Sequence, residues 1–179
     1  MVAGHRVVSD PLAIPFSKGR NLLCIFSKKH IENPPEHKQQ KLLHNQRTMQ
    51  RMSELLTKGG QCIYVAPSGG RDRIDENTGQ VEISPFDPAS IEMFYLMAQQ
   101  AKTPTHFYPL RLSTYDLLPP PKTVDREVGE RRCAHSAPVH LSFGKEIDMV
   151  NFPGSDTKDK KARRAVRAHY IWELVKQEY

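Results

Sequence analysis

Long apolar runs are missing from this 179-residue sequence. Uninterrupted apolar runs such as Leu22–Phe26 are only a few residues long, whereas a helix that crosses a bilayer needs about 18–20 apolar residues. We therefore expect no transmembrane segment. With 38% hydrophobic and 26% charged residues, the chain has the composition of a globular protein. A chain of this length can bury a hydrophobic core without disulfides or metal ions.

Cysteine is also scarce. The three cysteines, separated by 38 and 71 positions, are Cys24, Cys62 and Cys133. Zinc sites use closely spaced pairs, and small secreted domains use even, dense sets. The sequence therefore predicts a reducing compartment, no metal site and no cofactor. The first ten residues have the pattern of neither a signal peptide nor a transit peptide.

The excess of positive charge is confined to one segment. The formal net charge is +6, and residues 158–167 contribute +5 of it, from six Lys or Arg and one Asp. The rest of the chain is close to neutral, and the segment has no aromatic residue on which a base could stack, so we expect no nucleic-acid partner. Two interpretations of the segment stay open: a solvated helix face, or a surface that attracts an acidic protein.

Apolar runs alternate with stretches of helical periodicity. Strands are predicted at residues 21–26, 61–66 and 106–112, with weaker candidates at 124–128 and 139–143. Helices are predicted at residues 36–58, 87–101 and 158–178. The first helix has an apolar face of residues spaced by three and four, and Gly59-Gly60 should end it. That face consists of Leu42, Met49, Met52, Leu55 and Leu56. This alternation predicts an α/β fold with a mostly parallel sheet flanked by helices.

Two polar clusters follow the first two predicted strands, where ligands bind in parallel sheets. Residues 27–30 (SKKH) follow the first strand, and residues 67–73 (PSGGRDR) follow the second. If these strands are neighbours, four side chains converge on one edge of the sheet: Lys29, His30, Arg71 and Arg73. Together they suit a phosphate monoester, whose two negative charges need more than one cation. Solvated loop charges are the alternative, because the loop lacks the Gly-Lys-Ser/Thr ending of a P-loop.

A set of linked motifs points to a known family. The motifs lie at residues 7–12, 15–22, 27–30, 66–73, 85–87 and 116–121. In this order and at these spacings they closely resemble the soluble plastid glycerol-3-phosphate acyltransferases. The similarity covers most of residues 4–130. It implies the α/β fold of that family, and it implies that Lys29, His30, Arg71 and Arg73 bind the substrate phosphate.

The resemblance also implies a reaction. An acyl chain would pass from an acyl-acyl carrier protein or acyl-CoA to the 1-hydroxyl of glycerol 3-phosphate, the first step of phospholipid synthesis. The location implied is the plastid stroma, whereas the composition without the resemblance fits the cytoplasm. In the family, a histidine and an aspartate five positions later provide the general base, and no covalent acyl-enzyme forms.

The sequence departs from the family at that base. The catalytic motif and the N-terminal helical domain would precede residue 1, so we expect residues 1–179 to be a single, partial acyltransferase domain without catalytic residues, inactive by itself. His5 and Asp10 have the family's separation, but Asp10 belongs to a different motif, so we interpret the match as accidental. The alternative function is a non-catalytic phosphoester-binding module, which would bind glycerol phosphate without turnover.

Overall fold

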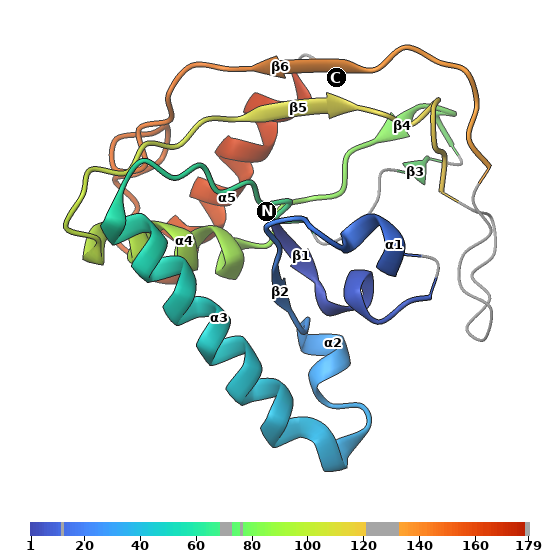
Figure 1. Ribbon diagram of the computed structural model, residues 1–179. Helices are drawn as coiled ribbons and strands as arrows, with labels where there is room; N and C mark the ends of the chain where they lie inside the picture. The colour runs from blue at the N-terminus through green and yellow to red at the C-terminus, as the bar shows by residue number, and fades with distance from the viewer. Residues whose placement is uncertain (12, 69–72, 76, 121–132, 178–179) are drawn as a thin grey trace. The chain divides into compact units, whose positions relative to one another are not determined.

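The computed structural model describes residues 1–11, 13–68, 73–75, 77–120 and 133–177 (Figure 1). The chain divides into two compact units. The first comprises residues 1–66 and 96–105, and the second comprises residues 67–95 and 106–179. The candidate strand at 124–128 lies outside the described residues. The single domain predicted from the sequence stays a prediction.

The first unit is built around a parallel strand pair and one long helix. Its elements are β1 (Val2–Gly4), η1 (His5–Val8), α1 (Ile14–Ser17), β2 (Leu23–Ile25), α2 (Lys28–Ile31), η2 (Pro35–His37) and α3 (Lys38–Lys58). The strands β1 and β2 pair in parallel, with Val2 opposite Leu23. Figure 1 shows the short helix α2 beside the N-terminal part of α3. The predicted long helix is therefore confirmed, although its first residues form the 3-10 turn η2.

Glycine ends α3 as the sequence predicts. Gly59 follows the last helical residue with φ of 73°, and Gly60 has φ of 63°. Both values lie in the left-handed region, which glycine enters without a steric penalty from Cβ. A methyl group at Gly59 would also come within 2.9 Å of the side chain of Thr103. Alanine at this position would therefore be strained twice.

The strand predicted at residues 61–66 is wrong, because the structure assigns no strand to these six described residues. They nevertheless lie beside β1, since the amide of Val2 donates to the carbonyl oxygen of Tyr64 at 2.8 Å. The partner of β2 is instead β1, a three-residue strand that no apolar run had indicated. One backbone bond places an extended segment next to a strand, but a ladder needs several.

The second unit combines two antiparallel strand pairs with two helices. Its elements are β3 (Arg73–Ile74), β4 (Val81–Glu82), α4 (Pro88–Gln100, whose last residues belong to the first unit), β5 (Leu110–Ser113), β6 (His140–Phe143) and α5 (Lys160–Lys176). β3 pairs with β4, and β5 pairs with β6. The chain thus combines helices with small sheets, which is compatible with the predicted α/β class. Among the described residues, however, parallel pairing is limited to β1 and β2.

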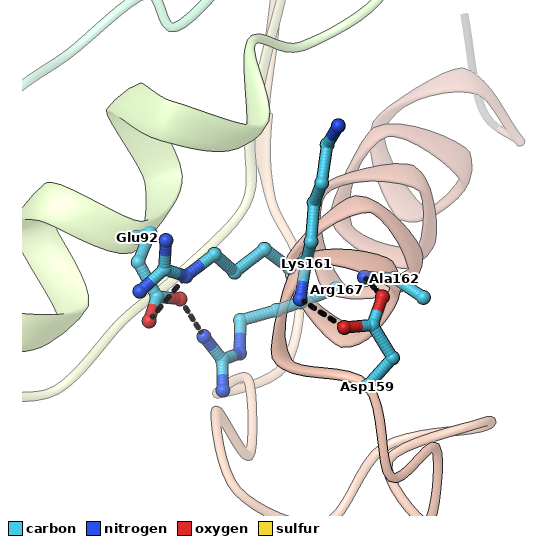
Figure 2. A network of polar contacts seen from close by, with 6 residues as sticks. Glu92, Asp159, Lys161, Ala162 and Arg167 are labelled. Carbon is cyan, nitrogen blue, oxygen red and sulfur yellow. Dashed lines mark hydrogen bonds and ion pairs between the residues drawn. The ribbon is translucent and has the colours of Figure 1, made fainter.

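Side-chain caps begin both long helices of this unit. Asp87 accepts hydrogen bonds from the amide and the hydroxyl of Ser90, at 3.0 and 2.7 Å, which confirms the predicted start of α4. Asp159 accepts from the amides of Lys161 and Ala162 at the start of α5 (Figure 2). Each carboxylate satisfies amides that have no partner inside the helix.

The core of the second unit lies between α4, α5 and the segment after β6. Its buried side chains are Ile91, Ile147, Met149, Ala168 and Ile171. Trp172 donates from its indole nitrogen to the carbonyl oxygen of Ile83 at 3.2 Å, and Arg111 on β5 donates to the carbonyl oxygen of Leu174. These bonds attach α5 to β5 and to the residue that follows β4.

One arginine of the basic segment is buried rather than solvated. Arg167 is only 5% exposed and forms an ion pair with Glu92 on α4 (Figure 2). Its guanidinium lies 4.2 Å from the ring centroid of Tyr95 and 5.2 Å from that of Phe152. Arg164 shares the same carboxylate at 3.2 Å. Both interpretations of the segment as a purely exposed surface therefore need correction at this position.

Among the described residues, no helix combines the length and apolarity that crossing a bilayer would require. The same part of the chain contains no cluster of three or more His, Cys, Asp or Glu residues arranged to hold a metal ion.

Candidate functional site

The predicted phosphate-binding residues come from both units. Lys29 and His30 lie on α2, directly after β2, as the sequence predicts. Arg73 is the first residue of β3, in the second unit. Arg71 lies outside the described residues. The structure therefore places Lys29 and His30 on one helical turn, and the convergence of all four side chains stays a prediction.

The turn that carries Lys29 and His30 is too short to be stable by itself. Helix α2 has four residues, and a single turn fixes several backbone dihedrals for very few hydrogen bonds. Locally, the carbonyl oxygen of Ser27 accepts from the amides of His30 and Ile31 at 2.9 and 3.0 Å. The Ser27 hydroxyl lies 2.9 Å from Nδ1 of His30, which restrains the imidazole ring. Further support must come from outside the turn.

That support comes from one face of α3, which we call the anchoring face. It consists of Lys41, His44, Asn45 and Thr48, at the three- and four-residue spacings that place side chains on one side of a helix. Nε2 of His44 and the hydroxyl of Thr48 donate to the carbonyl oxygen of Cys24, at 2.9 and 3.1 Å. Apolar periodicity does not reveal this face, because its residues are polar.

The other two residues of the anchoring face hold the backbone on either side of α2. Asn45 forms two 2.8 Å bonds with Phe26, accepting from its amide and donating to its carbonyl oxygen. Lys41 donates from Nζ to the carbonyl oxygens of His30 and Asn33, at 2.9 and 2.5 Å. Lys41 is only 9% exposed, and its ammonium lies 5.8 Å from the centroid of the Phe26 ring. These contacts compensate for the hydration that the ammonium loses on burial.

An aromatic cluster lies at the same end of β2. The ring of His5 stacks on Phe26 with centroids 4.1 Å apart, and His44 meets both rings edge-on at 5.2 and 5.3 Å. Burial, and secondarily the nearby charge of His44, lower the pKa of His5 below its ordinary value of 6.5. The folded protein thus disfavours the protonated form of His5.

This lowered pKa predicts a loss of stability in acid. Because the unfolded chain takes up a proton on His5 at a higher pH than the folded chain, the free energy of unfolding should fall as the pH drops below 6.5. Urea unfolding at about pH 7.5 and about pH 5.5 measures the change. The matched variant His5→Phe keeps a ring on Phe26 but cannot be protonated, so its stability should change less between the two pH values. An equal change in both proteins would contradict the assignment to His5.

Comparison with protein-family models gives no match. Comparison with curated proteins gives relatives over nearly the whole chain. The chloroplastic glycerol-3-phosphate acyltransferase of Arabidopsis thaliana is 38% identical over 178 residues, which are 99% of this chain and 39% of the relative. The enzyme of the same name from Spinacia oleracea is 39% identical over 178 residues, 99% of this chain and 38% of its own length.

A third relative agrees with these two. The glycerol-3-phosphate acyltransferase ATS12, chloroplastic, of Cucurbita moschata is 41% identical over 164 residues, which are 92% of this chain and 36% of the relative. This chain is homologous to part of the chloroplastic glycerol-3-phosphate acyltransferases. The resemblance seen in the motifs is thereby confirmed. The chain spans about two fifths of the length of these acyltransferases.

Proposed function

We propose that this chain supplies the glycerol 3-phosphate site of a plastid glycerol-3-phosphate 1-O-acyltransferase. The observation that carries the proposal is the match to chloroplastic enzymes of that name along 92–99% of the chain. The anchored turn with Lys29 and His30 supports it, because a firmly held backbone reduces the cost of ordering a charged binding site. We further propose the family's mostly parallel sheet, with β1 and β2 as part of it, and a location in the stroma.

In the proposed site, Lys29, His30, Arg71 and Arg73 bind the phosphate of glycerol 3-phosphate. Arginine offers paired planar donors, lysine adds a compact charge, and histidine adds a further N–H. Holding the phosphate fixes the distance between the substrate's 1-hydroxyl and the acyl donor, which raises their effective concentration. No residue of this chain is assigned as the general base.

The reaction proposed is a direct acyl transfer. The 1-hydroxyl oxygen attacks the thioester carbonyl of an acyl-acyl carrier protein or acyl-CoA, the C–S bond breaks, and the thiol leaves with the proton that the hydroxyl loses. The product is 1-acylglycerol 3-phosphate, and no cofactor takes part. If an acidic carrier protein docks on the basic segment, the residues available are the exposed ones, Lys158, Lys160, Lys161 and Arg164, because Arg167 is buried.

The test uses the protein as its gene encodes it. Glycerol 3-phosphate binding is measured by titration calorimetry, and transfer is followed with radiolabelled acyl-acyl carrier protein and acyl-CoA as alternative donors. Binding with transfer supports the proposal and identifies the donor. Binding without transfer would favour the phosphoester-binding module instead, and absence of binding would overturn both.

Arg71→Ala should weaken glycerol 3-phosphate binding by about 2–3 kcal/mol, which is roughly a 30- to 150-fold rise in Kd. The reason is that the variant removes two charge-assisted hydrogen bonds from the proposed phosphate site. The matched control is Arg51→Ala, which removes an exposed arginine of α3 that forms an ion pair with Glu54. Equal affinities of the two variants would contradict the role assigned to Arg71.

A further inference from the structure

The turn that carries Lys29 and His30 is tied to α3 at both ends. At its start, the amide of Phe26 donates to Oδ1 of Asn45, and Nδ2 of Asn45 donates to the carbonyl oxygen of Phe26, each at 2.8 Å. At its end, the carbonyl oxygen of His30 accepts from Nζ of Lys41 at 2.9 Å. Three residues, 27–29, therefore lie between two fixed points, Phe26 and His30, and the side chains that hold these points come from residues one helical turn apart on the same helix.

Lys41 is an unusual choice for such a contact, and this indicates a specific role. Burying an ammonium is costly, and an apolar side chain would pack this position of α3 more cheaply. Its Nζ atom instead donates to two carbonyl oxygens, that of His30 in the last turn of α2 and that of Asn33 just after the helix, where a helix leaves its carbonyl groups without a partner of its own. The buried charge thus fixes the backbone at the C-terminal end of α2, where the proposed phosphate ligands lie.

We propose that Lys41 and Asn45 are positioning residues for the phosphate site: they hold the Ser27–His30 turn so that Lys29 and His30 present their donors together. This inference rests on the proposed function. Neither residue is assigned a contact with the substrate. The expected consequence is a change in affinity for glycerol 3-phosphate, because electrostatic contacts with a phosphate weaken steeply when the donors are misplaced by about 1 Å.

The decisive variant is Lys41→Met, which keeps the aliphatic stem and the helix propensity but removes the ammonium. We expect the Kd for glycerol 3-phosphate to rise by about tenfold to a hundredfold. Lys41→Arg should recover much of the loss, since a guanidinium can donate to both carbonyl oxygens. The matched control is Lys38→Met, which removes an equal charge from the same helix, where Lys38 forms an exposed ion pair with Glu32.

Two further measurements on the same proteins distinguish a positioning role from a role in folding alone. Titration calorimetry gives the fraction of molecules able to bind as well as Kd, and thermal unfolding gives the fraction folded. A positioning role raises Kd while the binding fraction and the folded fraction stay unchanged. Where the protein turns over, the Michaelis constant for glycerol 3-phosphate should rise while that for the acyl donor does not. Asn45→Ala should act in the same direction as Lys41→Met.

Each outcome decides between the proposals. The inference is overturned if Lys41→Met leaves Kd within twofold of Lys38→Met, or if it lowers only the folded fraction. The variant Lys29→Ala distinguishes a failure of this inference from a failure of the proposed function. If Lys29→Ala weakens binding and Lys41→Met does not, the phosphate site stands without this support. If Lys29→Ala leaves glycerol 3-phosphate binding intact, the assignment of the phosphate site itself is wrong.

Discussion

Glu92→Ala should lower the free energy of unfolding by about 3–5 kcal/mol, which is among the largest effects expected for a single substitution outside the site. The carboxylate is the ion-pair partner of Arg167, which is 5% exposed and whose guanidinium contacts the rings of Tyr95 and Phe152. Removing it leaves a guanidinium buried without a counter-charge. Chemical denaturation at neutral pH, followed by circular dichroism, measures the loss.

The matched control for Glu92 is Glu146→Ala. Glu146 also pairs with a basic side chain, His106 at 2.7 Å, but both partners are more than half exposed, so the loss should be about 0–1 kcal/mol. The double variant Glu92→Leu with Arg167→Met should recover stability relative to Glu92→Leu, because it removes the unpaired charge and keeps apolar volume. A double variant as unstable as the single one would show that the ion pair is not the cause.

Local signals in the sequence predicted the helices well. The acid at Asp87 and the glycine at Gly59 act on their immediate neighbours, so their effects can be inferred without knowing the rest of the fold. Strands are harder to predict from local signals. Residues 61–66 are as apolar as a strand, but a strand exists only with a partner, and the partner of β2 is residues 2–4, which have no distinctive pattern. Pairing over long separations is not encoded in any one segment.

The candidate site shows the same division. The position of Lys29 and His30 after a strand followed from the order of elements, and the structure confirms it. The anchoring face of α3 was missed, because Lys41 and Asn45 have the composition of a solvated helix face. These two side chains are held against the turn because the backbone groups of Phe26 and His30 need hydrogen-bond partners there. Four polar residues at positions i, i+3, i+4 and i+7 were the available signal, and periodicity of apolar residues drew attention to the neighbouring positions instead.

Arg167 is the converse case. Six basic residues among ten indicate an exposed helix, and the surrounding lysines are exposed. One side of the helix must nevertheless face the core, and Arg167 is buried on that side together with Ala168 and Ile171. A long aliphatic stem with a delocalised charge fits this place, because Glu92 neutralises it and two aromatic rings cover it.

Met52→Ala should destabilise the first unit by about 2–5 kcal/mol, because the Met52 side chain is fully buried, with an exposed fraction of 0%. The residue continues the anchoring face of α3, four positions after Thr48. Loss of its volume leaves a cavity under the helix that holds the α2 turn. Amide hydrogen exchange of residues 38–58, compared with the wild type, would show the loss locally, while denaturation would show it globally.

Leu42→Ala provides the control within the same helix. Apolar periodicity assigned Leu42 and Met52 to one buried face, but Leu42 is 44% exposed in the structure. Its truncation should therefore cost no more than about 0.5 kcal/mol. Comparing the losses of stability of Met52→Ala and Leu42→Ala therefore tests which side of α3 faces the core. If both variants lose equal stability, Leu42 is buried in the folded protein, the anchoring face points elsewhere, and the contacts of Lys41 and Asn45 with the phosphate-binding turn cannot form as described.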